Sequence, residues 1–286
     1  MNWVNGYSIP FNKIPKQPDR LVTKTINSND FQIYSNCIKQ LKSIGAIRKC
    51  NPCKNQFLSS YFLVPKPSGG FRFVLNLKKL NTFISLSHFK MENIKSVKDM
   101  IRKDSYMCSI DLKDAYFSIS VARKHRKYLR FSFNDCLYEF TCLPFELCTA
   151  HFVFTKLCKP ILKYLRSKGI VLVMYLDDSI IISNSMEICS KNTNMVVKTF
   201  QDLGFVINYR KSVLQPNQSC RFLGFIFNSN RFIIQLPEDK VISAKRKILN
   251  LLHGNYCKVR NLAKLLGYLV SICPVFLYGW LYIQSP

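Results

Sequence analysis

Two adjacent acidic residues, Asp177 and Asp178, lie between two apolar runs, and this arrangement limits what the chain can fold into. The runs, residues 170–175 and 180–182, are rich in the Val and Ile typical of buried strands. The sequence therefore predicts a tight hairpin with both carboxylates at its tip. Crowded carboxylates repel each other where water is scarce, and a divalent cation relieves that repulsion. On their own, however, the two acids are better explained as a solvated turn.

A third acid, Asp111, stands in a similar frame, with residues 108–110 before it and Leu112 after it. This pattern predicts a second strand that brings its carboxylate to the same place. Three carboxylates that hold two Mg²⁺ ions are what nucleotidyl transfer requires. One ion lowers the pKa of the attacking 3′-hydroxyl, and both stabilise the charge that develops on the phosphoryl group. The three acids together indicate that chemistry.

The charge of the chain points to a polyanionic partner. It has 42 Lys and Arg against 16 Asp and Glu, a formal net charge of +26. Nucleic acid is the first expectation and an anionic membrane surface the second. The hydrophobic fraction of 48% over 286 residues excludes a disordered tail, because enough apolar surface is present for one large or two modest domains.

The twelve cysteines are scattered, and no secretory signal opens the chain. A disulfide-stapled secreted scaffold is normally much shorter, so we expect reduced thiols in an intracellular protein of the cytoplasm or nucleus that is not secreted. Cys50 and Cys53 have the spacing of half a zinc site. The sequence offers no second close cysteine pair and only four histidines, so no zinc is expected.

Apolar spacing predicts a mixed order of helices and strands after an extended, proline-punctuated start. A first helix is expected between a cap at Asp30 and a stop at Gly45. The further helices are expected over residues 150–165, 186–203, 240–252 and 259–272. The strand-like runs cover residues 61–65, 71–75, 131–140, 170–175, 180–182, 205–208 and 222–227, and a further apolar run over 106–121 is broken at residues 111–114.

The C-terminal run of residues 265–283 carries no charged side chain and has the length of a membrane-spanning helix. Pro274 lies in its middle, and Gly267 and Gly279 interrupt it. Lys258, Arg260 and Lys264 belong to an amphipathic pattern that runs into it. Buried helices of a globular subdomain are the favoured interpretation, with a membrane span as the alternative.

Five segments occur in an order that resembles the motifs of reverse transcriptases, above all those of long-terminal-repeat and DIRS-type retroelements. The segments are VPKPSGGFRFVLN (64–76, with Leu80-Asn81 after it), SIDLKDAYFSI (109–119), LPFELCTAHFVFTKL (143–157), YLDDSIIIS (175–183) and FLGF (222–225). The resemblance covers roughly residues 60–227. It is specific, because order, spacing and flanking apolar pattern all match.

The resemblance implies an α+β protein with the right-hand polymerase fold. The palm would be an antiparallel sheet packed on helices, joined to fingers and a short helical thumb. The expected divisions are 1–29 as an extended lead-in, 30–105 as fingers with the first nucleotide-gripping hairpin, 106–230 as palm with an inserted fingers segment at about 122–150, and 231–286 as a helical thumb or connection remnant.

The implied metal ligands are Asp111, Asp177 and Asp178, which would hold two Mg²⁺ ions with Mn²⁺ as a substitute. Lys211 falls where the family offers a lysine that protonates the pyrophosphate leaving group. The implied catalytic set is therefore these three acids and this lysine. An RNA template and a DNA primer are the expected partners, and the oligomeric state is left open.

The implied nucleotide site combines cations, backbone amides and rings. Its members are Lys66, Arg72, Leu112, Lys113, Asp114, Ala115, Tyr116 and Phe145. Arg72 would grip triphosphate oxygens, and Tyr116 would sit under the sugar and select dNTPs by excluding a 2′-hydroxyl. A plain core role is the alternative for each aromatic residue. The implied primer contacts are Tyr175, Phe222, Leu223 and Gly224.

Four positions depart from the family pattern. Glu146 stands where the family has glycine, and it adds bulk and negative charge beside a triphosphate. His151 replaces a proline, and Asn76 and Lys78 replace an Asp and an Arg. We therefore expect a fragment or degenerate copy of a retroelement polymerase. Two alternatives stay open: a catalytically inactive relic that binds nucleic acid through its charge, and an RNA-dependent RNA polymerase on the same palm.

Overall fold

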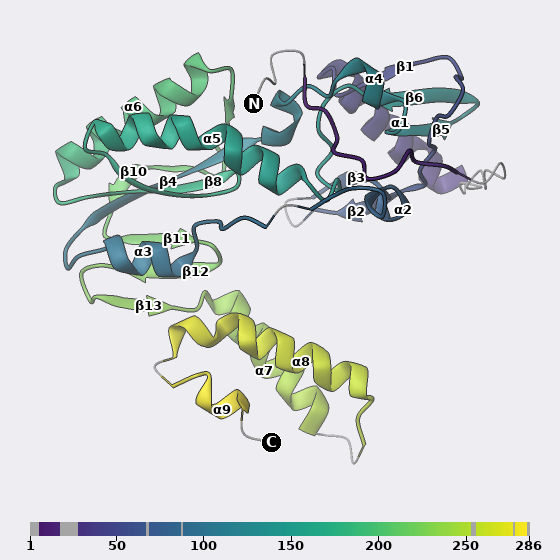
Figure 1. Cartoon of the computed structure of the whole chain (residues 1–286). Coiled ribbons are helices and arrows are strands. Elements are labelled where there is room, and N and C mark those ends of the chain that lie inside the picture. Colours follow the sequence, from purple (N-terminus) through teal and green to yellow (C-terminus); the bar gives the residue numbers. More distant parts are fainter. Residues whose placement is uncertain are drawn as a thin grey trace. The chain divides into compact units, whose positions relative to one another are not determined.

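The structure is a computed structural model, and it divides into two compact units (Figure 1). It describes residues 6–17, 28–66, 69–86, 88–252, 256–276 and 278–284. Unit 1 comprises the chain up to Lys90 together with Asp114–Ile161. Unit 2 comprises Met91–Lys113 and Leu162 onwards. The assignment of parts to fingers, palm and thumb stays a prediction.

Unit 1 is built on two small antiparallel sheets, one of three strands in the order β1-β6-β5 and one formed by the β2–β3 hairpin. Its strands are β1 (Ile47–Lys49), β2 (Tyr61–Pro65), β3 (Phe71–Leu75), β5 (Arg130–Phe133) and β6 (Cys136–Phe140). Its helices are α1 (Ser28–Ser43), α2 (Lys78–Asn81), the 3₁₀ turn η1 (Ala115–Ser118), α4 (Arg123–Arg126) and the first part of α5 (Ala150–Ser167). Aromatic rings fill the space between the sheets, because Tyr61 and Phe73 both contact Phe131.

The described part of the N-terminal lead-in, residues 6–17, is extended as expected and pairs with unit 1. Tyr7 forms a parallel bridge with Val121, and its hydroxyl donates to Thr149 Oγ1 at 2.9 Å. The backbone N–H of Ile9 donates to His125 Nδ1 at 2.7 Å. These contacts make the lead-in part of the unit, although its other residues up to 29 lie largely outside the described part.

A buried ion pair ties β5 to β6 in unit 1. Glu139 is 2% exposed and Arg130 is 7% exposed, and their charged groups lie 2.7 Å apart. Arg48 on β1 reaches the other carboxylate oxygen at 2.7 Å. Burial alone would raise the pKa of Glu139, but the hydrogen bonds from Arg130 and Arg48 outweigh it and lower that pKa. The pair therefore stays ionised and fixes three strands together.

Unit 2 contains the largest sheet, with five antiparallel strands in the order β10-β4-β8-β7 and with β9 added to the end of β4. These strands are β4 (Tyr106–Lys113), β7 (Val171–Tyr175), β8 (Asp178–Ser183), β9 (Val206–Ile207) and β10 (Val213–Asn217). A second sheet contains β11 (Ser219–Phe222), β12 (Phe225–Asn228) and β13 (Ile233–Gln235). The helices are α3 (Ile94–Met100), α6 (Met186–Asp202), α7 (Glu238–Leu252), α8 (Val259–Ile272), the 3₁₀ turn η2 (Cys273–Val275) and α9 (Leu281–Gln284).

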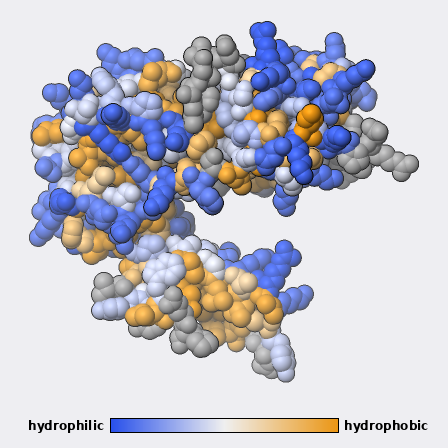
Figure 2. Space-filling view, in the orientation of Figure 1, coloured by the Kyte–Doolittle hydropathy of each residue, from blue (hydrophilic) through white to orange (hydrophobic). Residues whose placement is uncertain are grey.

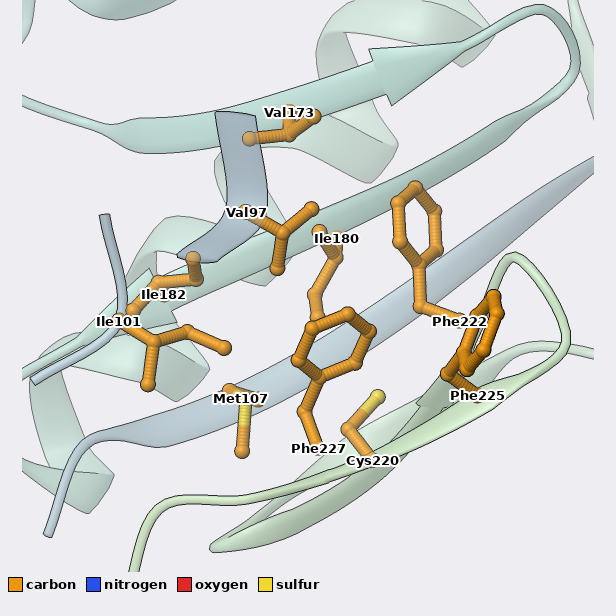
Figure 3. Close-up of a cluster of buried hydrophobic side chains, with 10 residues drawn as sticks. All are labelled: Val97, Ile101, Met107, Val173, Ile180, Ile182, Cys220, Phe222, Phe225 and Phe227. Atoms are coloured by element: carbon orange, nitrogen blue, oxygen red, sulfur yellow. The ribbon is translucent and has the colours of Figure 1, made fainter. Parts of the chain in front are cut away.

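The core of unit 2 lies between the large sheet, helix α3 and the β11–β12 hairpin (Figure 3). Alternate residues of the strands supply it, so Met107 of β4 and Ile180 of β8 point to this side. Phe225 and Phe227 approach them from β12. The opposite face of the same strands is covered by α6, where Cys108 and Cys189 lie 3.7 Å apart through their sulfur atoms. The sheet is thus buried on both faces.

Most of the predicted elements are confirmed, including β2, β3, the β5–β6 and β7–β8 hairpins, α5, α6, α7 and α8. Two expectations were wrong. Asp30 lies inside α1, which begins at Ser28; an acid also stabilises the first turn of a helix, so the residue type fits both places. Residues 222–227 form two strands joined by a turn at Leu223 and Gly224, whose φ angles are +49° and +74°. Neither angle is compatible with a continuous strand.

Within the described residues, no helix is long and apolar enough to cross a membrane. The apolar run over residues 265–283 is divided among the end of α8, the turn η2 and the start of α9. Much of this segment is exposed all the same, with Tyr278, Trp280 and Leu281 each more than half exposed. Figure 2 shows the corresponding apolar surface over the C-terminal helices.

Candidate active site

Asp111 and Asp178 are direct cross-strand neighbours in the large sheet of unit 2. The antiparallel register of β4 and β8 pairs Cys108 with Ile181 and, three residues on, Asp111 with Asp178. Side chains of such a pair lie on the same face of a sheet, with Cβ atoms about 4.5–5.5 Å apart. Two like charges placed this way destabilise the sheet unless something neutralises them. The two acids predicted on separate strands are therefore brought together by strand pairing.

Asp177 lies in the two-residue turn between β7 and β8. Leu176 precedes it with a φ of +56°, a conformation that is costly for a side chain with a Cβ. The backbone N–H of Leu112 donates to the carbonyl oxygen of Asp177 at 2.9 Å, which ties the turn to β4. The structure thus confirms the predicted hairpin with both acids at its tip.

The neighbouring carboxylates and burial together perturb Asp178 strongly. Burial, followed by the charges of Asp177 and Asp111, raises the pKa of Asp178 from 3.8 to about 7. A hydrogen bond with Asp111 acts in the same direction, and Lys211 opposes it. A strongly perturbed acid of this kind is typical of functional sites.

The donor chemistry of this cluster fits a hard divalent cation, because carboxylate oxygens are the ligands that Mg²⁺ prefers. As the side chains stand, no three His, Cys, Asp or Glu groups in the described ranges are close enough to hold one ion together. The fit therefore rests on the carboxylate chemistry of the cluster and on the cross-strand pairing of Asp111 with Asp178. The twelve cysteines are free thiols, and Cys50 and Cys53 belong to no such group.

The turn between β9 and β10 encloses Asp111. The Asn208 side-chain amide donates to Asp111 Oδ1 at 2.7 Å, and the Asn208 backbone N–H donates to the Asp111 carbonyl at 2.8 Å. The Asp111 N–H in turn donates to Ser212 Oγ at 3.0 Å. The Lys211 ammonium lies 3.6 Å from Asp111 Oδ2. The structure therefore brings Lys211 to the predicted acids, and it adds Asn208 and Ser212 to them.

Replacing Asp178 with asparagine should stabilise the metal-free protein at about pH 8. A raised pKa means that the native state holds the Asp178 proton more tightly than the unfolded state does. Protonation of Asp178 therefore stabilises the native state; this contribution is complete below pH 3.8 and is lost as the pH rises through about 7. Asparagine carries no charge to desolvate. We expect the melting temperature in EDTA to rise by about 2–4 °C at that pH, the equivalent of about 1 kcal/mol, and the difference to fade in acid. Equal melting curves at both pH values, with Asp202→Asn as the control, would contradict this.

The predicted nucleotide residues from Asp114 onwards, together with Lys66 and Arg72, lie in unit 1, whereas Leu112 and Lys113 end β4 in unit 2. Asp114 has a φ of +51° and begins the 3₁₀ turn that carries Ala115 and Tyr116, both buried. The left-handed residue turns the chain sharply away from β4. The five consecutive residues 112–116 thus adopt three backbone conformations: strand, left-handed turn and 3₁₀ helix.

Tyr116 lies in an aromatic cluster of unit 1. Its ring is edge-on to Phe145 at a centroid distance of 5.1 Å and lies 5.8 Å from His151 and 5.0 Å from Phe154. Phe154 is buried and comes from α5, whereas Phe145 is 42% exposed. Edge-on ring pairs of this kind stabilise one another by about 0.5–1.5 kcal/mol. Tyr116 therefore packs against rings of α5 and of the Phe145 loop, and Phe145 also presents surface to solvent.

The loop that carries Phe145 is fastened by one side chain. Asn81 donates from Nδ2 to the carbonyl of Glu146 at 3.0 Å and accepts the N–H of Cys148 on Oδ1 at 3.0 Å. Burial raises the pKa of Glu146 from 4.5 to about 7, although the positive charge of Arg72 opposes the shift. Glu146 is thus a partly neutral acid at neutral pH, near the cation expected to bind a triphosphate.

Lys66 and Arg72 belong to the end of the β2–β3 hairpin, and both side chains are exposed. The Lys66 N–H donates to the Gly70 carbonyl at 2.9 Å, which closes the hairpin turn. Gly69 and Gly70 both have positive φ angles that this turn requires. Residues 67 and 68 of the predicted basic turn lie outside the described residues. The hairpin presents two cations to solvent.

The predicted primer contacts divide between core and surface. Phe222 is 4% exposed and points into the core of unit 2, so its side chain is committed to packing (Figure 3). Leu223, Gly224 and Tyr175 are partly exposed. Lys240 of α7 lies close to Gly224, because a Cβ added at that glycine would lie 2.5 Å from the lysine Nζ. The turn thus exposes part of Leu223 and the backbone at Gly224, with Lys240 beside them.

Sequence reasoning missed three positioning residues, Asn81, Asn208 and Ser212. Each holds a predicted site residue or its loop through a hydrogen bond that joins distant parts of the chain. The available signals were weak. Asn81 belongs to the quoted Leu80-Asn81 segment, and Asn208 and Ser212 flank Lys211.

Residues 64–227 match the family model described as "Reverse transcriptase (RNA-dependent DNA polymerase)". The chain is 26% identical over 232 residues to the retrovirus-related Pol polyprotein from transposon gypsy of Drosophila melanogaster, which covers 76% of the chain and 22% of that protein. It is 25% identical over 242 residues to the transposon Tf2-3 polyprotein of Schizosaccharomyces pombe, with coverages of 84% and 17%. The chain thus spans about a fifth of the length of the curated relatives it matches.

Solved structures share the fold. The foamy viral protease-reverse transcriptase in complex with dsDNA superposes with a TM-score of 0.76 at 19% identity, covering 93% of this chain and 52% of that one. The same protein in complex with an RNA/DNA hybrid gives a TM-score of 0.72 at 18% identity, with coverages of 98% and 36%. The predicted α+β polymerase fold is confirmed.

Proposed function

The chain belongs to the reverse transcriptase (RNA-dependent DNA polymerase) family, and from this premise we propose that it adds dNTPs to a primer 3′-hydroxyl under the direction of an RNA template. The observation that carries the proposal is the cross-strand pair of Asp111 and Asp178, with Asp177 beside it and a pKa of about 7 at Asp178. Such an accumulation of negative charge destabilises the protein unless cations occupy it, which supports a two-metal nucleotidyl transfer.

The predicted acids and basic residues have distinct parts in this reaction. Asp111, Asp177 and Asp178 would hold two Mg²⁺ ions, which when bound activate the 3′-hydroxyl and stabilise the charge on the transferred phosphoryl group. Lys211, 3.6 Å from Asp111, would give a proton to the leaving pyrophosphate. The exposed Lys66 and Arg72 would bind the triphosphate, with Arg72 able to do so through two parallel hydrogen bonds.

The base and sugar would meet aromatic surface. Phe145 is the exposed ring of its cluster and would pack on the nucleotide. Tyr116 is held by Phe145 and Phe154, and its rigidity would make a 2′-hydroxyl clash, which favours dNTPs over rNTPs. Lys113, Asp114 and Ala115 would offer backbone amides to the triphosphate. The amide of Leu112, which was predicted with them, is already donated to the Asp177 carbonyl.

The partners are proposed from charge and from the relatives. A formal net charge of +26 suits a polyanion, and the foamy viral protein of the same fold binds dsDNA and an RNA/DNA hybrid. We propose an RNA template with a DNA primer, contacted by the turn at Leu223 and Gly224 and by the basic helix α7.

Glu146 favours a second candidate function, that of an inactive relic that binds nucleic acid through its charge. This residue puts a half-buried acid near Arg72, where the family pattern has glycine. An acid there weakens the binding of a triphosphate by repulsion. The two functions share nucleic-acid binding and differ in metal-dependent extension.

Primer extension separates the candidates. On poly(rA)–oligo(dT) with dTTP and Mg²⁺, we expect extension that EDTA abolishes and excess Mg²⁺ restores, and little incorporation of UTP. Salt-sensitive binding to the same duplex without extension would support the relic. Preferential use of UTP would instead support an RNA-dependent RNA polymerase.

A further inference from the structure

We propose that Lys211 and a divalent cation compete for the same oxygen of Asp111, and that Asn208 enforces this competition by occupying the other oxygen. The inference rests on the proposed function, because it concerns the metal site of that reaction. It assigns a positioning role to Asn208 and a second, inhibitory role to Lys211.

The two oxygens of Asp111 have different partners. Oδ1 accepts the Asn208 amide at 2.7 Å, a short bond of the kind formed with charged acceptors. Oδ2 faces the Lys211 ammonium at 3.6 Å, which is an ion-pair distance without close hydrogen bonding. The Asp111 carboxylate also shares a hydrogen bond with Asp178, but of its two basic or amide partners Lys211 is the more distant. Oδ2 is therefore the oxygen that we assign to an incoming ion.

Several hydrogen bonds between the Asn208–Ser212 turn and Asp111 hold the Asp111 carboxylate in place. Asn208 and Asp111 are joined by both backbone and side chain, and Ser212 binds the Asp111 N–H while donating its hydroxyl proton to the Asn208 carbonyl at 2.9 Å. This closed set of hydrogen bonds fixes the rotation of the Asp111 carboxylate. With Oδ1 engaged, a metal ion must use Oδ2.

Lys211, unlike Asn208, has a side chain that is mostly exposed to solvent. Its side chain is 59% exposed, whereas that of Asp111 is 14% exposed. A flexible, solvated lysine exchanges readily with another cation, and its charge also acts on Asp178. Arrival of the metal would thus release the Lys211 ammonium from Asp111, leaving it available to the leaving pyrophosphate only after the site is loaded.

The test measures the affinity of the whole chain for Mn²⁺ at low ionic strength, without nucleic acid or nucleotide. The electron paramagnetic resonance signal of Mn²⁺ that remains free in solution reports how much is bound. Lys211→Met should tighten binding about threefold, because it removes the competing charge of an exposed pair. Asn208→Ala should weaken it about tenfold, because the Asp111 carboxylate loses the partner that orients it and this loss outweighs the freeing of Oδ1. Lys211→Arg keeps the charge and should bind as the wild type does. Lys191→Met, on the exposed face of α6, is the matched control.

The proposal is supported if Lys211→Met binds Mn²⁺ more tightly and Asn208→Ala binds it more weakly than the wild type, and if the gain in Lys211→Met shrinks as salt is added. Binding by Lys211→Met that equals or falls below that of Lys191→Met overturns it, even if Asn208→Ala does not fold. Unchanged binding by a folded Asn208→Ala overturns the positioning role. Absence of Mn²⁺ binding in the wild type, or equal binding by Asp177→Asn, Asp178→Asn, would instead remove the two-metal function itself.

Discussion

Replacing Asp177 and Asp178 together with asparagine is expected to reduce primer extension by at least about a thousandfold, because residues that act as one unit lose nearly all of the rate when the unit is broken. Asparagine keeps the size of the side chain and leaves the backbone pairing of Tyr175 with Asp178 intact. What it removes is the negative charge that would hold the metal ions. Steady-state incorporation of dTTP on poly(rA)–oligo(dT) measures the effect.

The matched control is Glu187→Gln with Asp202→Asn, which removes two charges from the exposed surface of α6 in the same unit. It should extend the primer as the wild type does. Duplex affinity should be unchanged in both double variants, since phosphate contacts come from the basic residues. Extension by Asp177→Asn, Asp178→Asn within tenfold of the wild type would show that these carboxylates are not the catalytic centre.

Replacing Glu146 with glycine is expected to improve the use of dTTP at about pH 8 by tenfold or more, the equivalent of about 1.4 kcal/mol. Two effects contribute to this gain, the loss of a negative charge and the loss of side-chain bulk, and a glutamine variant distinguishes them. Glu146→Gln removes only the charge, and Glu146→Gly also removes bulk from a loop that Asn81 holds in place. We therefore expect the KM for dTTP to fall in the order wild type, glutamine variant, glycine variant.

The pH dependence identifies the charge. Burial raises the pKa of Glu146 to about 7, so the carboxyl is mostly neutral at about pH 6 and mostly ionised at about pH 8. The KM ratio of wild type to Glu146→Gln should therefore approach one in the acidic range and grow as the pH rises. Glu187→Gln is the control, and a ratio that does not change with pH would exclude repulsion by Glu146. No gain for either variant at either pH would mean that this acid does not reach the nucleotide.

The sequence was most informative where a local pattern carries its own physical constraint. The β7–β8 hairpin was predictable because its two apolar runs favour burial, whereas burying the two charged acids between them would cost free energy. The acids are therefore expected in the turn. The β5–β6 hairpin was predictable from Asn134 and Asp135, which tolerate the positive φ angles that both adopt. Short strands without periodicity, such as β10 and β13, gave no such signal, because their pairing partners lie elsewhere in the chain.

The sequence by itself determined the family, the α+β order of elements and the identity of the acids, because residue types and their spacing are linear information. Only the tertiary structure decided that Asp111 stands opposite Asp178, since strand register is set by the burial of a whole sheet face. It also decided that Phe222 is committed to the core. The roles of Asn81 and Asn208 arise in the same way, because one amide side chain becomes a clamp only when folding brings a distant loop within about 3 Å of it.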